Sequence, residues 1–215
     1  LDESKMFNTA RKFGFSEKSG IQFPYESSGS LKNNKSWSEL SKSEIAIGYE
    51  VSVTTLQMAM AYSAIGNGGV LMKPQLIQKL KTPKGHEQKI DRMDALRRVA
   101  SEKTMHTMSD ILEKAVSQGT GNKAFLPNLK IAGKTGTAKK LKNGKYVSEY
   151  IASFASFYPS DDPEYTLIVT VDHPRSGGYT GGMVAAPIAK EIYRRIYNLK
   201  GRDAEPYLQA SVPKD

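Results

Sequence analysis

The chain has 215 residues, and its 31 lysines and arginines against 22 aspartates and glutamates leave a formal net charge of +9. A hydrophobic fraction of 39% is too high for a disordered chain, and no apolar run reaches the ~18 residues that cross a bilayer. The absence of cysteine excludes disulfides, thiolate metal sites and cysteine nucleophiles. The charge is compatible with nucleic acid, anionic lipid or a polyanionic wall as partner, and a solvated basic surface explains it equally well.

The opening region, residues 1–50, is rich in Ser, Gly, Asn and Lys and shows little hydrophobic periodicity. This composition predicts long surface loops, with one short helix near Met6 to Phe13. A loop region of this length is unusual inside a compact domain. We therefore expect either a functional loop system or a packing partner that lies outside the chain.

Capping signals predict two helices in the middle of the chain. Thr54-x-x-Gln57 is a capping box, in which each side chain satisfies the other residue's backbone N–H, so a helix is expected from Thr55 to Ile65. Its residues are apolar on nearly every side, which indicates a buried helix. A second helix is expected after a cap at Ser101, and a short strand is expected between the two helices, around residues 76–80.

Strand-like segments and a final helix follow. The strands are expected at Leu129 to Lys134, Ile151 to Phe157 and Tyr165 to Val171, with turn residues between them. Short connections imply an antiparallel meander instead of crossovers. Pro187 predicts the first turn of an amphipathic helix whose isoleucines pack on this sheet. The predicted fold class is therefore α+β, an antiparallel sheet meander flanked by helices.

The most informative motif is Gly133-Lys134-Thr135-Gly136-Thr137. Gly-Lys-Thr suggests a phosphate-binding P-loop, but that motif needs a glycine where the chain has Asn128, and it needs a helix directly after the threonine. The residues after Thr137 instead form a hairpin-like run toward the next strand. These departures count against a nucleotide-binding loop.

A strand that ends in Lys-Thr-Gly-Thr beside a cleft suits another chemistry. Lys134 supplies a cation, and the hydroxyls of Thr135 and Thr137 can donate to a carboxylate. Gly136 lets an extended peptide lie against the backbone as an added strand, and a backbone N–H at this place can stabilise an oxyanion. These are the requirements for holding a peptide C-terminus while its last amide is attacked.

Further segments accompany the motif in a definite order. They are Phe13-Gly14-Phe15, Ala46-Ile47-Gly48, Val53-Thr54-Thr55-Leu56-Gln57, Asn67-Gly68-Gly69 with Pro74, Gly119-Thr120-Gly121, Ala152-Ser153-Phe154 ahead of Tyr158-Pro159, and Gly181-Gly182 with Ala185-Ala186-Pro187. With these segments, the chain from about Phe7 to Tyr197 resembles the C-terminal part of the transpeptidase domain of class B penicillin-binding proteins. Members of that family are serine acyltransferases that cross-link peptidoglycan. The resemblance implies a penicillin-binding and β-lactamase-like transpeptidase fold, incomplete on its N-terminal side.

The resemblance implies a role for each residue of the motif. Lys134 would support the serine of a Ser-x-Asn motif and attract the substrate carboxylate, while Thr135 and Thr137 would bind that carboxylate or that of a β-lactam. The backbone N–H of Thr137 would be one oxyanion donor. The catalytic candidates are therefore Lys134 and Thr137, and the substrate-binding candidates are Thr135, Gly136 and Thr137. No metal or organic cofactor is implied, since the acyl group passes through a serine ester.

The resemblance also implies that the chain is a fragment. No Ser-x-x-Lys and no Ser-x-Asn stands ahead of the matched segments, although both motifs precede them in the family. Residues 1–215 are then the C-terminal portion of a single transpeptidase domain, and a length of about one and a half typical domains is the greater part of one larger domain. Its expected parts are a loop-rich region 1–50, a mainly helical region 51–120, strands and a C-terminal helix in 125–200, and a tail 201–215.

The whole enzyme would transfer the acyl group of a terminal D-Ala-D-Ala to serine and then to an amine of a neighbouring stem peptide. Its expected partners are the stem peptide, β-lactams, the missing N-terminal part of the same domain and other cell-wall synthesis proteins, and nucleic acid is not among them. Its expected place is outside the cytoplasmic membrane, anchored through a segment not present in this chain. The alternative is a non-catalytic penicillin-binding-like module or a β-lactam sensor domain.

Other polar clusters have simpler interpretations. His173 beside Asp172 suggests a catalytic triad, but both residues follow a strand and precede Pro174, so a turn is favoured. Asp161 and Asp162 are likewise interpreted as part of a turn and not as an acid and base pair.

Three further features are assigned no chemistry of their own. His86 and His106 have no second ligand at metal-binding spacing. The glycine-rich run 176–182 favours a flexible loop near the cleft over an anion site. The lysines of residues 139–145, with Tyr146 nearby, favour a solvated hairpin tip over contact with nucleic acid.

Overall fold

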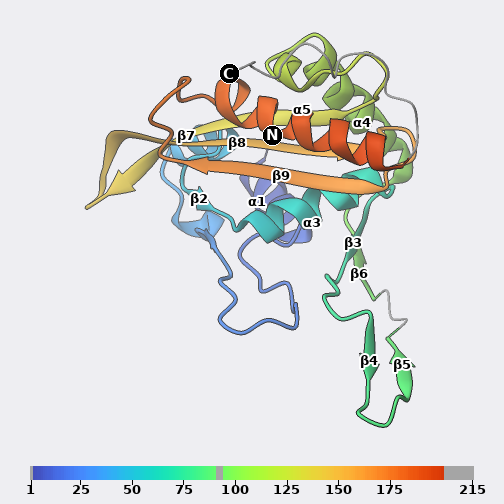
Figure 1. Cartoon of the computed structure of the whole chain (residues 1–215). Coiled ribbons are helices and arrows are strands. Elements are labelled where there is room, and N and C mark those ends of the chain that lie inside the picture. Colours follow the sequence, from blue (N-terminus) through green and yellow to red (C-terminus); the bar gives the residue numbers. More distant parts are fainter. Residues whose placement is uncertain (1, 91–93, 201–215) are drawn as a thin grey trace. The chain divides into compact units, whose positions relative to one another are not determined.

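The structure is a computed structural model that describes residues 2–90 and 94–200. The chain divides into two compact units, Leu1–Ser109 and Asp110–Asp215, and helix α4 (Glu102–Ser117) crosses the division. Figure 1 shows the helices and strands of both units. No helix in the described part of the chain is long and apolar enough to cross a membrane.

The N-terminal unit alternates short helices with two-stranded ribbons. Its helices are α1 (Glu3–Lys12), η1 (Asn34–Ser36), α2 (Ser41–Ala46) and α3 (Thr55–Gly66), followed by the start of α4. Its strands pair antiparallel as β1 (Ser30–Leu31) with β2 (Val51–Ser52), β3 (Val70–Met72) with β6 (Ala95–Arg98), and β4 (Lys79–Lys81) with β5 (Glu87–Lys89).

The predicted helices of this unit are confirmed, and its strands are more numerous than predicted. Helix α1 covers most of the helix expected near Met6, and α4 follows the cap at Ser101, whose hydroxyl accepts from the Thr104 N–H at 3.3 Å. Between α3 and α4, however, the described residues form four short strands where one was predicted. Two of them, β4 and β5, consist of exposed residues, so the alternation of buried and exposed side chains that marks a strand is absent.

Helix α3 begins at the predicted capping box. The Thr54 hydroxyl accepts from the Gln57 N–H at 3.1 Å, and the Gln57 side chain accepts from the Thr54 N–H at 2.8 Å. The Gln57 amide also donates to the carbonyls of Glu17 and Ser28, each at 2.8 Å. Gln57 is buried, so one side chain both starts the helix and holds two loop segments. Near it lies the core of this unit, which is formed by Met60, Ala64, Leu71 and Val99.

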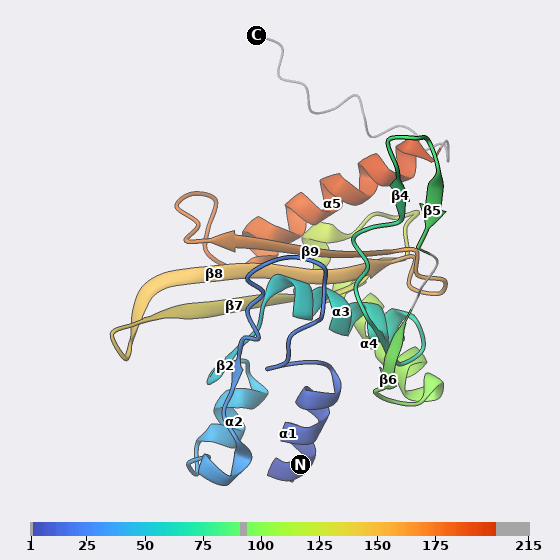
Figure 2. The ribbon, with the colours of Figure 1, turned by 90° about the horizontal axis from the view of Figure 1, so that it is seen from below.

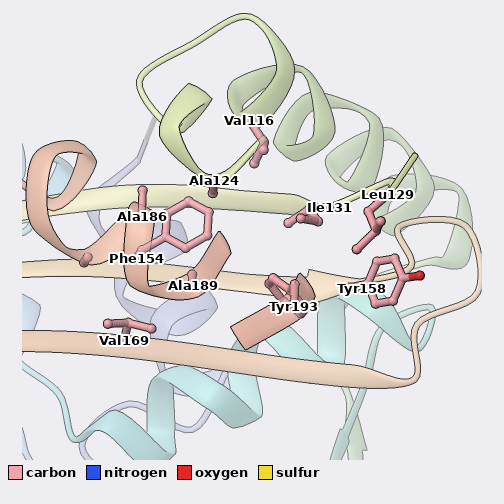
Figure 3. Close-up of a cluster of buried hydrophobic side chains, with 11 residues drawn as sticks. Val116, Ala124, Leu129, Ile131, Phe154, Tyr158, Val169, Ala186, Ala189 and Tyr193 are labelled. Atoms are coloured by element: carbon pink, nitrogen blue, oxygen red, sulfur yellow. The ribbon is translucent and has the colours of Figure 1, made fainter. Parts of the chain in front are cut away.

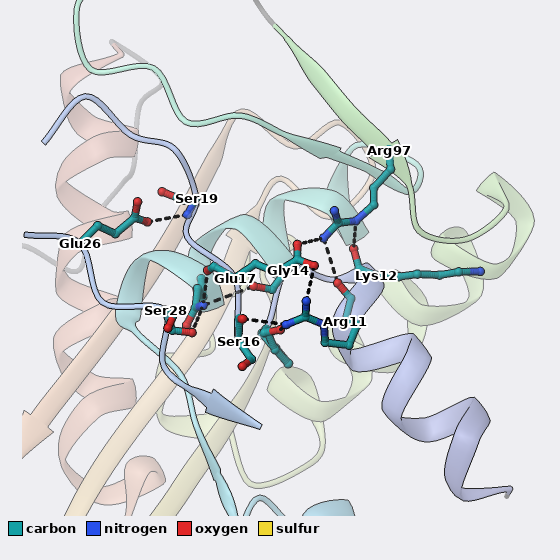
Figure 4. A network of polar contacts seen from close by, with 11 residues as sticks. Arg11, Lys12, Gly14, Ser16, Glu17, Ser19, Glu26, Ser28 and Arg97 are labelled. Atoms are coloured by element: carbon teal, nitrogen blue, oxygen red, sulfur yellow. Dashed lines mark hydrogen bonds and ion pairs between the residues drawn. The ribbon is translucent and has the colours of Figure 1, made fainter. Parts of the chain in front are cut away.

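A charged network fixes the end of α1 to β6, as Figure 4 shows. Glu17 pairs with Arg11 at 2.9 Å and with Arg97 at 2.6 Å. Arg97 also donates to the carbonyls of Arg11 and Lys12, at 2.9 and 2.8 Å, where the helix ends. The loops of the opening region are therefore held by polar contacts within this unit.

The C-terminal unit is a three-stranded sheet followed by a long helix. The strands β7 (Ala132–Lys142), β8 (Lys145–Tyr158) and β9 (Tyr165–Asp172) pair antiparallel in the order β7-β8-β9. Helix α5 (Gly181–Leu199) comes after them, and a short helix η2 (Asn122–Ala124) comes before them. The predicted α+β fold with an antiparallel meander is confirmed.

Helix α5 begins earlier than the sequence predicts. Thr180 caps it, with its hydroxyl accepting from the Met183 N–H at 3.3 Å, so the helix starts at Gly181. Pro187 therefore lies inside the helix and not in its first turn. Two glycines are poor helix formers, which favoured the later start, but a threonine cap and the packing of the first turn are sufficient here.

The core of this unit lies between the sheet and α5, as Figure 3 shows. Phe154 and Tyr158 of β8 are buried in one cluster with Ala185, Ala189 and Tyr193 of the helix. The small alanine side chains allow the helix to approach the sheet closely, and the aromatic rings fill the remaining space.

One polar contact is buried in this core. Ser156 donates to the Leu167 carbonyl at 3.1 Å, so the Tyr193 hydroxyl, 2.9 Å from Ser156, is the donor in their mutual bond. Burial raises the pKa of Tyr193, which keeps this hydroxyl protonated. The polar tip of the largest buried helix residue is thus satisfied, and the helix is held in one register on the sheet.

Candidate active site

The Lys-Thr-Gly-Thr motif lies on β7, at an edge of the sheet. Among the described strands, β7 pairs only with β8, where Gly136 faces Ser153 and Thr137 faces Ala152. The strand continues to Lys142, so the motif does not end it as the sequence predicted, because the lysine-rich run goes on pairing with β8. The four predicted site residues therefore stand next to one another on a strand that can accept a further strand along its other edge.

The side chains of the motif alternate between two faces of β7. Thr135 and Thr137 lie on the face that carries α5, and Lys134 lies on the opposite face. Lys134 is exposed, and its Nζ donates to the Thr135 carbonyl at 3.2 Å. Only a ligand that lies along the edge of the strand can meet both the ammonium group and the threonine hydroxyls.

The first turn of α5 orients the Thr137 hydroxyl. The Gly181 N–H donates to Thr137 Oγ1 at 3.1 Å. A hydroxyl that accepts in this way keeps its own proton to donate elsewhere. The start of the helix also brings the positive end of its dipole to this hydroxyl, which favours a negatively charged ligand.

Thr120 is a residue of the site that the sequence analysis did not assign. Its Oγ1 lies 2.8 Å from Thr135 Oγ1, so one of the two hydroxyls donates to the other and the acceptor keeps a proton for a ligand. The two residues stand far apart in the sequence, and the only signal was a hydroxyl between Gly119 and Gly121. Together with Thr137, this pair leaves two hydroxyl protons for a ligand, the number that a carboxylate can accept side by side.

Two glycines at the site occupy positions where a side chain would clash with a neighbouring element. A Cβ at Gly181 would lie 2.1 Å from the Ser153 carbonyl oxygen and 2.5 Å from that of Gly136. A Cβ at Gly136 would lie 2.5 Å from Ser153 Oγ. The absence of a side chain at Gly181 therefore lets the start of α5 lie against the motif, whereas its absence at Gly136 makes room for Ser153 of β8.

The remaining polar candidates form no catalytic pair, and the turn predicted for Asp172 is wrong, because Asp172 is the last residue of β9 and pairs with Ile151. Asp172 pairs with Lys140 at 2.5 Å and not with His173, whose Nδ1 lies 3.1 Å from Glu149. His173 has a positive φ of 51°, as a turn residue does, which confirms the turn and removes the triad. Asp161 pairs with Lys130 at 2.7 Å, and this hydrogen bond lowers the pKa of Asp161.

The sequence matches a known family along most of its length. The family described as "Penicillin binding protein transpeptidase domain" matches residues 1–194. Stage V sporulation protein D of Bacillus subtilis (strain 168) is 38% identical over 196 residues, which are 90% of this chain and 30% of that protein. Peptidoglycan D,D-transpeptidase FtsI of Escherichia coli (strain K12) is 33% identical over 208 residues, 96% of this chain and 33% of that protein. The chain thus spans about a third of the length of these curated relatives.

The fold is also similar to that of a solved penicillin binding protein. Penicillin binding protein 3 from Mycobacterium tuberculosis, solved in complex with aztreonam, matches with a TM-score of 0.85 and 30% sequence identity, over 94% of this chain and 48% of that chain. This match confirms the transpeptidase fold that the sequence motifs predicted. The matched residues and the matched fold show that the chain belongs to the penicillin-binding protein transpeptidase domain family.

Proposed function

We propose that this chain forms one wall of the active-site cleft of a peptidoglycan D,D-transpeptidase that works through a serine ester and is inhibited by β-lactams. The observation that carries the proposal is the edge strand β7, which presents Lys134 and two oriented threonine hydroxyls along one edge. A relative named Peptidoglycan D,D-transpeptidase and a relative solved in complex with aztreonam support the substrate class.

The donor peptide lies along the free edge of β7 in this proposal. Thr135 and Thr137 bind its terminal carboxylate, with Lys134 adding positive charge at the same edge. Gly136 leaves room for the peptide backbone, and the Thr137 N–H donates to the oxyanion that forms when the amide carbonyl is attacked. The serine oxygen bonds to the acyl carbon, the terminal D-Ala leaves with a proton on its nitrogen, and an amine of a second peptide then displaces the serine.

We place the nucleophile in a part of the protein that this chain does not cover. The chain has one Ser-x-x-Lys spacing, Ser211 to Lys214, which follows the last helix instead of preceding the motif and lies outside the described residues. Residues 1–215 then form the C-terminal portion of a single transpeptidase domain, and this chain alone is inactive. The enzyme acts outside the cytoplasmic membrane, where peptidoglycan is cross-linked.

The proposal is tested on the full-length protein that carries this chain, with a fluorescent penicillin. Lys134→Ala is expected to slow acylation about a hundredfold, because the positive charge beside the bound carboxylate is lost, an effect as large as the removal of one preorganised hydrogen-bond donor from an active site. Lys145→Ala, an exposed lysine near the tip of the same hairpin, is the matched control and keeps the rate. Equal acylation by the wild type and Lys134→Ala would remove Lys134 from the site.

A second measurement separates an enzyme from a silent binding module. The wild-type protein is expected to release D-Ala from a D-Ala-D-Ala donor when an amine acceptor is present. A β-lactam sensor would be acylated by penicillin but would leave the donor intact. That result would refute the transpeptidase hypothesis and support a non-catalytic binding module.

A further inference from the structure

Lys139 stands two residues beyond Thr137 on the same face of β7. The pairing of β7 with β8 runs without a break from Ala132 opposite Phe157 to Lys139 opposite Tyr150, and the register shifts only after that point. Because side chains alternate along an unbroken strand, Thr135, Thr137 and Lys139 form one row on the face that carries α5.

The charge of Lys139 is not neutralised by the protein. Its side chain is exposed and makes no hydrogen bond or ion pair with residues 2–90 or 94–200. The next lysines of the strand differ, since Lys140 pairs with Asp172 and Lys142 pairs with Glu149, each at 2.5 Å. Lys139 is therefore an available cation at the border of the motif.

The surroundings of Lys139 tie it to the site. Its cross-strand partner Tyr150 stacks on Tyr179, with ring centroids 4.4 Å apart, and Tyr179 directly precedes the cap of α5. The N–H of Gly181 in the first turn of that helix is bonded to Thr137. Figures 1 and 2 show the loop before α5 and the β7-β8 hairpin at the same end of the sheet. The positive end of the helix dipole and Lys139 thus act on the same region.

The path of a donor peptide leads past this cation. Strands β7, β8 and β9 are all antiparallel, and a peptide that joins the sheet in the same manner, with its C-terminal carboxylate at Thr135 and Thr137, runs back toward Lys142. A strand rises about 3.4 Å per residue, so the Cα of Lys139 lies about 7 Å beyond that of Thr137. A lysine side chain can therefore reach the residues that precede the cleaved bond.

We propose that Lys139 is a specificity-determining residue that binds a carboxylate on the donor peptide, one to three residues before the bond that is cleaved. The inference rests on the proposed function and adds a substrate class to it, an acidic peptide. The ion pair between Lys139 and the donor carboxylate is exposed to solvent, so we expect it to raise kcat/KM by only about two- to fivefold. This gain should decrease as salt is added.

The test compares two synthetic donors that both end in D-Ala-D-Ala and differ only in Glu or Gln at the residue two places before the cleaved bond. The full-length wild-type protein is expected to prefer the Glu donor about two- to fivefold in kcat/KM at low salt. Lys139→Ala is expected to abolish the preference, and Lys139→Glu to reverse it. Lys145→Ala removes the same charge at the hairpin tip and is expected to keep the preference.

Each outcome decides a separate claim. An equal preference in the wild type and in Lys139→Ala, with unchanged Tm values, overturns the role of Lys139 while the transpeptidase function stands. If Lys145→Ala loses the preference for the Glu donor as fully as Lys139→Ala does, the preference comes from the general charge of the hairpin, and the role of Lys139 is again overturned. Turnover of neither donor by the wild type refutes the proposed function, and the inference about Lys139 falls with it.

Discussion

The two glycines at the site lack a side chain for different physical reasons. At Gly181 an added Cβ would strike the backbone oxygens of Ser153 and Gly136, which cannot move without displacing a strand or the helix. At Gly136 the nearest atom to an added Cβ is the Ser153 hydroxyl oxygen, at 2.5 Å, and the next is Ser153 Cβ at 3.9 Å. Within the fold, the first glycine is therefore required by neighbouring backbone atoms, whereas the second is required by one neighbouring side chain.

A rescue experiment follows from this difference. Gly136→Ala is expected to lower the stability of the protein by about 1–2 kcal/mol, because the new methyl group overlaps Ser153 Oγ. Adding Ser153→Ala removes that oxygen and should restore most of the loss. Gly181→Ala with the same Ser153→Ala change is the matched control, in which no rescue is expected because the clashing atoms belong to the backbone.

Urea unfolding of the wild type, of Gly136→Ala and Gly181→Ala, of each combined with Ser153→Ala, and of Ser153→Ala alone measures these effects. Equal losses for Gly136→Ala with and without Ser153→Ala would mean that the glycine is needed for its backbone freedom instead. The stability data are independent of activity, so they test the packing at the motif even if the chemistry is assigned differently.

At the site, the residues that are contiguous in the sequence could be predicted, whereas their contacts with distant residues could not. The motif Lys134 to Thr137 is contiguous, and the alternation of a strand already places Lys134 opposite to the threonines. The partner of Thr135 could not be predicted, because Thr120 is brought to it by the chain that folds between them. The hydrogen bond between Gly181 and Thr137 could not be predicted for the same reason, because it depends on where α5 packs against the sheet.

At the scale of whole elements, the predictions succeeded where a local signal is complete. Helix α3 begins at its capping box, because the two bonds that define the box lie within four consecutive residues. β8 and β9 were found from their aromatic and β-branched residues. The ribbon of β4 and β5 was missed because pairing of exposed lysine-rich strands leaves no hydrophobic pattern.

Helix α3 shows how one side chain can link elements. Gln57 accepts one bond at the helix start and donates to the carbonyls of Glu17 and Ser28, so its amide serves as acceptor and donor at once. Burial makes each of these contacts costly to lose, because a carbonyl left without a partner cannot turn to water.

Three variants separate the cap from the link to the loops. Thr54→Ala removes one cap bond and is expected to lower stability by about 1 kcal/mol. Gln57→Glu keeps the shape of the side chain but turns a carboxylate toward two carbonyls, so we expect a loss of about 3 kcal/mol or more. Gln57→Ala should fall between them. Thermal unfolding gives the order, and a Gln57→Glu protein as stable as the wild type would show that the amide does not hold the loops.

At the scale of the whole molecule, the candidate site belongs to one unit. The motif, Thr120 and the start of α5 all lie in Asp110–Asp215, which has its own core around Phe154 and Tyr193. The N-terminal unit has a separate core around Leu71. One unit thus builds the whole strand edge to which the proposed function assigns the carboxylate, and the same proposal requires the attacking serine to come from elsewhere.

The division between binding and attack can be tested on this chain directly. Opening of a β-lactam needs a serine whose proton is taken up by a neighbouring base. In our proposal the edge of β7 instead supplies threonine hydroxyls that donate to the ligand, and its lysine, Lys134, lies on the other face of the strand. Mass spectrometry after incubation with benzylpenicillin should therefore find no covalent adduct on residues 1–215, but one adduct on the full-length protein. Ser211→Ala is the control for the one serine with a lysine three residues later. An adduct on the chain that disappears in Ser211→Ala would place the nucleophile at the C-terminal end and contradict the division, because attack would then come from the same chain that holds the carboxylate.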